Sequence, residues 1–526
     1  KSGRPSEQKV YIGAAVLLSI CSLVPIWIVS SFSTQNGPAF LNIAHMFNEM
    51  HNPDFAYSDH FMRHVHYMPY LPMYALLIGL SSVFPVLVAN KIMLSLMVLL
   101  FPAAVFSFLA QADPRKVLFA FPAYLIIYNF SFMRGYYNFF IAAALMFVFL
   151  ALWQKYKDSL SSRRLIALNL LFLSVYLSHI IVAILLGGLI IFLLLLEGKS
   201  VKHVALHVLS IGLPVFVSIL YYAWFSHAYS VWNQGEHEIM HWWFKTENLA
   251  LRFLWPYSSL GKVLAAIPFL LLAVVFLRQK GDVLYRFRTG KRIFIANSRE
   301  NRSILLFLLF VMLYYVFPWK IMGWHKADAH LIIFLFVFFL ACPRPFAAKR
   351  HRMAFVLLTG VLALGLFFIV AKQMRALDQA IRHEYLAGLN LLQANAKMAC
   401  FSVDNSGDSS SVMNPYAHAF EYYSLHKGIM TGKSLAMFNT ISPVWYREYQ
   451  AFPDFPDFPS LGKEGLDQAG FREIRQHYDY VLIWGRDADF AELFLDNGFV
   501  SVIEQQRLHI LKPELRREGE TERRRD

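Results

Sequence analysis

The chain has 526 residues, of which 57% are hydrophobic and 16% are charged. A soluble globular protein has ~45–50% apolar and ~25% charged residues, so this composition excludes an ordinary soluble protein. The net charge of +14 comes from basic residues in short connections between apolar runs, which argues against a nucleic-acid binder. The three cysteines show neither disulfide spacing nor zinc spacing.

The apolar residues come in runs that are long enough to cross the ~30 Å hydrocarbon core of a bilayer. The first run, 10–30, follows Lys1, Arg4 and Lys9 and lacks a convincing cleavage site, so we expect a retained helix with a cytoplasmic N-terminus. Further spans are expected at 117–131, 138–153, 165–178, 180–196, 204–225, 260–277, 303–319, 329–342 and 353–371.

Basic connections orient these spans, because cytoplasmic loops carry an excess of Lys and Arg. The connections 154–164, 197–203, 278–302 and 343–352 are basic and should be cytoplasmic. The connections between them, and everything after residue 371, should then lie outside.

One stretch, 70–110, does not fit the pattern. It must cross the membrane an odd number of times, yet it contains two apolar pieces, 70–88 and 92–110, that Asn90 and Lys91 separate. One piece could be re-entrant or interfacial, and the pattern leaves this topology open.

The expected outer loop, 32–69, begins with the turn Asn36-Gly37-Pro38. Apolar residues then recur at helical spacing, which predicts an amphipathic helix resting on the membrane surface. We also expect the aromatic segment 241–255 to lie along the outer surface.

After residue 371 the pattern changes to short strand-like runs at 398–403, 480–484, 499–504 and 508–511. Helical patterns at 417–426 and 487–497 lie between them. The sequence therefore predicts a transmembrane domain at 1–371, a small extracytoplasmic α/β domain at 372–515 and a charged disordered tail at 516–526.

Three internal stretches and one tail phrase carry a resemblance to a known class. They are 36–44 (NGPAFLNIA), 134–139 (RGYYNF), the Ser178–His179 pair and 478–483 (YDYVLI). Together they resemble the GT-C class of membrane glycosyltransferases, and more closely a poorly described bacterial group within it.

This resemblance implies transfer of a sugar from a polyprenyl-phosphate carrier to an acceptor outside the cytoplasmic membrane. It also implies an acidic residue in the first outer loop, but Asn36 stands where an Asp is expected before Gly37-Pro38. Either another acid takes this role, or the chain is a degenerate relative that serves as an accessory or scaffolding subunit.

Asp54 and Asp59 are the candidate catalytic bases, because activating an acceptor hydroxyl requires a carboxylate within hydrogen-bond reach. The plainer interpretation is that one caps a turn and the other is solvated. Arg63, His64 and His66 follow and are candidates for holding phosphate or substrate. Two histidines are weak evidence for a metal site, which would need Asp59 or His60 as a further ligand, so no metal ligand is assigned.

Arg134 lies at an outer boundary beside Tyr137 and Asn138, where a basic residue runs against the positive-inside trend. It is a candidate for binding a lipid-linked phosphate, although snorkelling to headgroups would explain it equally well. His179 falls where two spans meet, and we expect it in the same substrate site or simply hydrated in a turn.

His325, Lys326 and Asp328 form a further polar cluster on the expected outer side. Lys326 could neutralise a leaving phosphate, or it could pair with Asp328 and do nothing more.

The sequence thus predicts a mainly α, polytopic, GT-C-like transmembrane helix bundle with a small C-terminal extracytoplasmic α/β domain. We expect a multi-pass protein of the bacterial inner membrane, acting in the cell envelope as a hexosyl- or pentosyltransferase. Its partners would be membrane lipid, a polyprenyl-phosphate sugar and a glycan, lipid or protein acceptor, with other membrane subunits an option and no nucleic acid. No cofactor is certain, and a divalent cation (Mg²⁺ or Mn²⁺) stays open.

Overall fold

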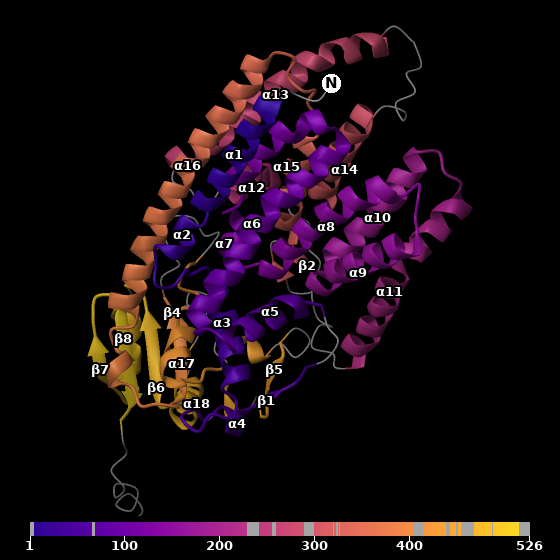
Figure 1. Cartoon of the computed structure of the whole chain (residues 1–526). Helices are drawn as coiled ribbons and strands as arrows, with labels where there is room; N and C mark the ends of the chain where they lie inside the picture. Colours follow the sequence, from indigo (N-terminus) through magenta and orange to yellow (C-terminus); the bar gives the residue numbers. More distant parts are fainter. Residues whose placement is uncertain are drawn as a thin grey trace, which may run out of the picture. The chain divides into compact units, whose positions relative to one another are not determined.

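The computed structural model of the chain forms two compact units (Figure 1). The first, here called the membrane unit, comprises Lys1–Phe32, Tyr67–Leu80 and Leu87–Arg375. The second, here called the composite unit, comprises Ser33–His66, Ser81–Val86 and Ala376–Asp526. The structure describes residues 5–65, 69–228, 241–254, 259–288, 299–318, 320–321, 324–325, 327–403, 414–437, 442–448, 451–453, 466, 468–486 and 488–514.

The membrane unit is helical. Its elements are α1 (Pro5–Cys21), α2 (Val24–Trp27), α5 (Leu71–Ser81), α6 (Val86–Ala112), the 3₁₀ helix η1 (Pro114–Leu125), α7 (Phe130–Arg134), α8 (Tyr137–Tyr156), α9 (Ser162–Ser178), α10 (Ile180–Leu196), α11 (Val201–Ala228), α12 (Trp242–Leu254), α13 (Ser259–Arg288), α14 (Arg299–Val316), the short strands β2 (Lys320–Ile321) and β3 (Trp324–His325), the 3₁₀ helix η2 (Ala327–His330), α15 (Leu331–Leu340) and α16 (Lys349–Ala380).

Seven helical segments in the described part of the chain are long and apolar enough to cross a membrane. Four shorter apolar helices, including α5 and α10, accompany them. Large apolar side chains such as Leu17, Phe216 and Phe368 are more than half exposed on these helices. Large apolar side chains exposed on so many long apolar helices need hydrocarbon around them, and the chain is a multi-pass membrane protein.

The structure corrects the expected division of 70–110. The break falls between α5 and α6, and Asn90 and Lys91 lie inside α6, where the Lys91 ammonium donates to the carbonyl of Val29. At 1.5 Å per residue, α5 is only ~16 Å long, whereas α6 is ~40 Å long. Only α6 is therefore long enough to span the bilayer.

The span expected at 117–131 is not a regular α-helix. Pro114 begins the 3₁₀ helix η1, whose first turn is capped by the Asp113 side chain accepting from the Arg115 N–H, and Pro122 lies inside it. Proline lacks the N–H that an α-helix needs, which favours the tighter, irregular form. The segment is almost wholly buried inside the unit, where neighbouring helices can satisfy its backbone.

The composite unit brings two distant parts of the chain together. From the N-terminal half it takes α3 (Gly37–Asn48), α4 (Tyr57–His60) and β1 (Phe61–Arg63). From the C-terminal part it takes a π-helical turn (Ile381–Tyr385), η4 (Leu389–Leu391), β4 (Met398–Ser402), α17 (Glu421–Lys427), η5 (Leu435–Met437), β5 (Val444–Tyr446), α18 (Gln468–His477), β6 (Tyr480–Trp484), α19 (Ala488–Asp496), β7 (Phe499–Glu504) and β8 (Leu508–Pro513).

The C-terminal strands form one mixed sheet in the order β4-β6-β8-β7 (Figure 1). Strands β4 and β6 are parallel and buried along nearly their whole length, which explains their continuous apolar runs. Phe401 and Ile483 of the sheet pack against Ile474 of α18 and Phe494 of α19. The four strands expected from the sequence are confirmed as the small α/β fold.

Segment 33–66 joins this domain through a strand pair and a helix pair. Strand β1 pairs antiparallel with β5, with Met62 opposite Trp445, and α3 packs against α17. The helix expected over this segment exists, and it packs within the composite unit, while its place on a membrane surface stays a prediction. Asn42, which the pattern puts on the polar face, is buried, because α3 is covered by C-terminal residues of the same unit.

Gly428 supplies a specific test of this packing. It ends α17 in the left-handed conformation (φ +66°), and an added Cβ would lie within 2.8 Å of Phe55 and closer still to Asn395 Oδ1. We expect Gly428→Ala to lower the unfolding free energy of the composite unit by at least ~1–2 kcal/mol, the cost of a left-handed L-residue. Thermal unfolding of the purified protein measures this.

The matched control is Gly365→Ala in α16, where a Cβ would meet nothing within 4 Å. That variant should be neutral or stabilised by ~0.5–1 kcal/mol. Equal behaviour of the two variants would contradict the packing around Gly428.

Candidate functional site

A cluster of aromatic and histidine side chains gathers in the membrane unit where several helices end. Its members, here called the histidine cluster, are Tyr70, Tyr136, Phe139, His179 and His330. Residues from three of the segments singled out in the sequence meet here: Tyr136 and Phe139 from 134–139, His179, and His330.

Arg134 comes shortly before Tyr136 of this cluster in the sequence, and the local residues determine where its helix, α7, begins and ends. The Asn129 side chain accepts from the Phe132 N–H and starts α7, and Gly135 ends the helix in the left-handed conformation (φ +84°). Arg134 is thus the last residue of α7 and is half-buried. Its guanidinium is a planar fork of donors suited to phosphate.

His179 separates α9 from α10. Its extended backbone (φ −163°) breaks the helix between Ser178 and Ile180. The buried ring lies edge-on to Tyr70 and Phe139, with ring centroids 5.4 and 5.6 Å away. Its Nδ1 atom has no hydrogen-bond partner among the residues that the structure describes, so a polar group of a ligand would satisfy it.

His330 is a member that sequence reasoning did not assign. It ends η2, stacks on Tyr136 with ring centroids 4.9 Å apart, and lies 5.3 Å from the His179 ring. The available signal was its position at the end of the polar segment 325–330. Tyr70 was also missed: it has a positive φ of 77°, uncommon for a tyrosine, and strained backbone of this kind gathers at functional sites.

Asp328 has a structural partner in the turn that carries His330. Its Oδ2 atom lies 3.9 Å from Nζ of Lys245 in α12, and both side chains are fully buried. The same ammonium donates to the carbonyls of Tyr314 and Phe317 at the end of α14. Lys245 is thus a partner that the structure describes for Asp328, and the pair holds η2 in place.

The other candidates of this unit have different surroundings. Tyr137 is fully buried and packs edge-on to Phe132. Asn138 is buried, and its Oδ1 atom has no partner among the described residues. His325 lies in β3, opposite Lys320. Lys326 lies outside the described residues.

Asp54 and Asp59 both lie in the composite unit and are exposed. The Asp54 N–H donates to the Asn52 side chain, and its carbonyl accepts from Asn395 Nδ2, so the backbone of this turn is fixed. Asp59 lies in the single-turn helix α4. Their exposure leaves both carboxylates open to a substrate.

Arg63 has a local role that the sequence did not indicate. Its guanidinium donates to the carbonyls of Phe47 (2.8 Å) and Asn48 (3.4 Å) at the end of α3, and lies over the Phe47 ring. A basic group at a helix C-terminus satisfies unpaired carbonyls and the helix dipole. His64 follows β1 and stacks on Trp445, while His66 lies outside the described residues.

Among the described residues of the composite unit, the most deeply buried acid is Glu421, which sequence reasoning missed. Asn42 Nδ2 donates to Glu421 Oε2 at 2.5 Å, joining α3 to α17 across 379 residues. Glu421 Oε1 and Asn42 Oδ1 have no partner among the described residues. Burial raises the pKa of Glu421 to about 8, against the lowering effect of the Asn42 hydrogen bond.

His45, one turn after Asn42, is half-buried, and its ring meets Phe55 and Tyr57 edge-on. Burial lowers the pKa of His45 to about 4, although the nearby Glu49 charge opposes this shift. The interior of the composite unit therefore holds an acid and a base that both favour their neutral forms near neutrality.

Within the described residues, no group of three or more His, Cys, Asp or Glu side chains could hold a metal ion. The chain's own side chains thus do not fit a complete metal site in this part of the structure.

No family model matches the chain. No curated protein matches it either. Among solved structures it is similar to ArnT from Cupriavidus metallidurans bound to undecaprenyl phosphate, with 12% identity, a TM-score of 0.51, and 96% of this chain and 98% of that chain covered. The apo state of the same protein gives 12% identity and a TM-score of 0.52, over 95% and 98% of the two chains.

A weaker similarity, with 11% identity and a TM-score of 0.46, links it to the archaeal oligosaccharyltransferase AglB from Archaeoglobus fulgidus in complex with an inhibitory peptide and a dolichol-phosphate, over 91% of this chain and 70% of that chain. The likeness to ArnT extends over almost the whole of both chains. It confirms the expected GT-C-like fold, and at this identity it shows the fold alone.

Glu421 makes the composite unit sensitive to pH. Because the folded-state pKa (about 8) exceeds the ordinary value of 4.5, its contribution to stability is fully present below pH 4.5 and is lost as the pH rises to about 8. Glu421→Gln removes the titration and should flatten this decline, which amounts to roughly 1.4 kcal/mol per pH unit within the window. Unfolding measured from pH 4.5 to 8 tests it.

The control is Glu504→Gln, an exposed acid of β7 in the same unit, which should keep the wild-type slope. The contribution of His45 to the unfolding free energy has the opposite pH dependence, because it is lost as the pH falls from 6.5 towards about 4. His45 is present in every variant, so this contribution cancels when a variant is compared with the wild type. An unchanged slope in Glu421→Gln would show that this carboxyl does not titrate in the window.

Proposed function

We propose that the chain is a membrane glycosyltransferase that moves a sugar from a polyprenyl-phosphate donor to an acceptor outside the cytoplasmic membrane. The observation that carries the proposal is the histidine cluster, with Arg134 next to it in the chain, in a GT-C-like fold. The similar ArnT structure was solved with undecaprenyl phosphate bound, which supports a lipid-phosphate ligand for this fold.

The phosphate would be held by Arg134, with His179 and His330 as further donors. Arg134 supplies a permanent positive charge, and the buried Nδ1 of His179 needs a polar partner. Asn138, with its buried amide oxygen, and Tyr137 would line the same site. His325 and Lys326, which precede Asp328 in the sequence, are proposed as further substrate-binding residues.

Asp59 or Asp54 would accept the proton of the acceptor hydroxyl. Both are exposed acids on a backbone held by the composite unit, and a carboxylate close to the hydroxyl is what general base catalysis needs. Arg63, His64 and His66 would bind substrate beside them; Arg63 would then have to release the carbonyls that end α3.

The proposed orientation follows from the basic connections, with the N-terminus in the cytoplasm and the C-terminal domain outside the bacterial inner membrane. In this topology α6 crosses once and α5 does not cross. The expected domain 1–371 would bind the donor, and 372–515 would bind a glycan, lipid or protein acceptor.

A second function, an accessory subunit of a larger membrane complex, is favoured by one observation. Asn36, where the GT-C pattern implies an acid, lies at the N-cap of α3, and its amide cannot act as a base. Stoichiometric co-purification with membrane partners and no sugar transfer would support this alternative.

The test is transfer from labelled polyprenyl-phosphate sugars by the purified protein and by the Asp54→Asn/Asp59→Asn double variant. Loss of a general base should reduce turnover by roughly 10²–10⁴-fold. Asp496→Asn, an exposed acid at the end of α19, is the matched control and should keep full activity. Full turnover in the double variant would remove both aspartates from the mechanism, and no turnover across several donors would favour the accessory subunit.

A further inference from the structure

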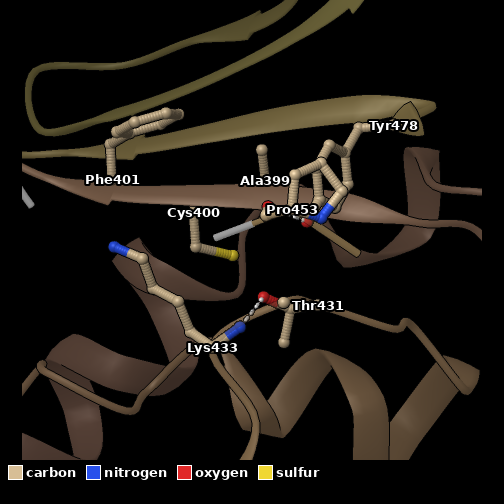
Figure 2. Close-up of a pocket in the computed structure, with 8 residues that line it drawn as sticks. Ala399, Cys400, Phe401, Thr431, Lys433, Pro453 and Tyr478 are labelled. Atoms are coloured by element: carbon tan, nitrogen blue, oxygen red, sulfur yellow. Dashed lines mark hydrogen bonds between the residues drawn. The ribbon is translucent and has the colours of Figure 1, made fainter. Parts of the chain in front are cut away.

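The composite unit contains a small pocket between strand β4 and the turn 431–433 (Figure 2). It has room for about one water molecule. The Cys400 thiol already donates to the carbonyl of Met398, and the Tyr478 hydroxyl donates to the carbonyl of Pro453 at 2.6 Å. The surface that needs a partner is instead on α12, in the membrane unit.

Helix α12 presents two tryptophans outward from the membrane unit. Trp242 and Trp243 are 59% and 60% exposed, and their rings meet edge-on with centroids 5.6 Å apart. Two residues after Trp243, the side chain of Lys245 is fully buried. Because successive residues of an α-helix are turned by about 100°, Lys245 and Trp243 point in nearly opposite directions.

The buried side of α12 is fixed to its neighbours. Nζ of Lys245 lies 3.9 Å from Oδ2 of Asp328 and donates to the carbonyl of Tyr314 at 2.9 Å. The Tyr314 hydroxyl donates back to the carbonyl of Lys245 at 2.8 Å, and the hydroxyls of Thr246 and Tyr315 are hydrogen-bonded at 3.1 Å. These contacts tie α12 to the end of α14 and to η2, the turn that carries His330, so a rotation that buried the tryptophans would break them.

The neighbours of α12 continue the same exposed surface. Val316, at the end of α14 that Lys245 contacts, is 63% exposed. Helix α13, which also packs against α12 and is long and apolar enough to cross a membrane, has Leu260 exposed by 65% at its first turn. The tryptophans of α12 thus extend the surface that the membrane unit turns towards lipid.

The outward face of α12 also carries an acid. Glu247 is exposed and follows Trp243 by four residues, which places both on one side of the helix. A carboxylate is costly in hydrocarbon, whereas tryptophan prefers the layer where one part of its ring is apolar and its N–H is wet. This combination fits the interfacial layer of a bilayer better than its core.

We propose that Trp242 and Trp243 dock in the interfacial layer of the bilayer, and that α12 thereby holds the histidine cluster at the depth of the lipid headgroups. The partner is the lipid surface itself. The depth of the tryptophans sets that of His330, because Lys245 and Asp328 join α12 to η2. The consequence for the donor rests on the proposed function: a lipid-linked phosphate would enter the cluster laterally, without leaving the membrane.

The test is quenching of tryptophan fluorescence in the full-length protein, reconstituted in phosphatidylcholine vesicles whose lipids carry bromine either close to the headgroup or near the bilayer centre. The difference between wild type and Trp242→Phe/Trp243→Phe reports these two side chains alone. We expect shallow bromine to quench this difference signal at least about twofold more than deep bromine.

The control is Trp484→Phe, which removes a buried tryptophan of the composite unit. Its difference signal should be quenched by neither lipid. An α12 signal that is equally resistant, or one that deep bromine quenches more strongly, would overturn the interfacial docking.

The depth-setting role has its own test, which is binding of undecaprenyl phosphate to the protein in unbrominated vesicles. Trp242→Gln/Trp243→Gln should weaken this binding several-fold, and Trp27→Gln, an exposed tryptophan of α2, should keep the wild-type affinity. Unchanged affinity in the α12 variant would overturn that role. Absence of binding by the wild type would reject the proposed function, whereas the quenching result would stand without it.

Discussion

Hydrocarbon offers no hydrogen-bond partners, and this constraint organises the membrane unit. Every backbone N–H and C=O at membrane depth must be satisfied within the protein, so the chain crosses as helices and its polar chemistry gathers where helices end. Gly135 ends α7 after Arg134, His179 breaks α9 from α10, and His330 precedes α15. The histidine cluster is thus a consequence of where the helices must stop.

The same logic explains the buried Lys245–Asp328 pair. Burying two charges is costly, and here the cost is offset by mutual attraction and by the carbonyls that end α14. The pair fixes the turn before α15, and with it the ring of His330. The composite unit has a comparable element in Asn42 and Glu421, which join α3 to α17 without a charge near neutrality.

Sequence periodicity was sufficient for the elements that depend on local patterns. Most spans, the four C-terminal strands and the helix over 37–48 follow from their apolar runs and spacing, whereas the irregular η1 and the break between α5 and α6 do not. Periodicity could not show that Asn42 meets Glu421 or that Met62 lies opposite Trp445, because such contacts join residues hundreds of positions apart. The charge pattern of the sequence placed Arg134 and His179 on the same expected side of the membrane. It could not show that the His330 ring contacts Tyr136, Phe139 and His179, because these residues are distant in the sequence.

The central claim is that the histidine cluster and Arg134 bind the phosphate of a polyprenyl carrier. The most direct measurement is photo-crosslinking of the purified protein with a polyprenyl phosphate that carries a photoreactive group close to the phosphate, followed by mapping of the labelled residues. The account predicts labels within 134–139, around His179 and around His330, and their loss on competition with undecaprenyl phosphate. Labels confined to other helices, or labels that resist competition, would contradict it.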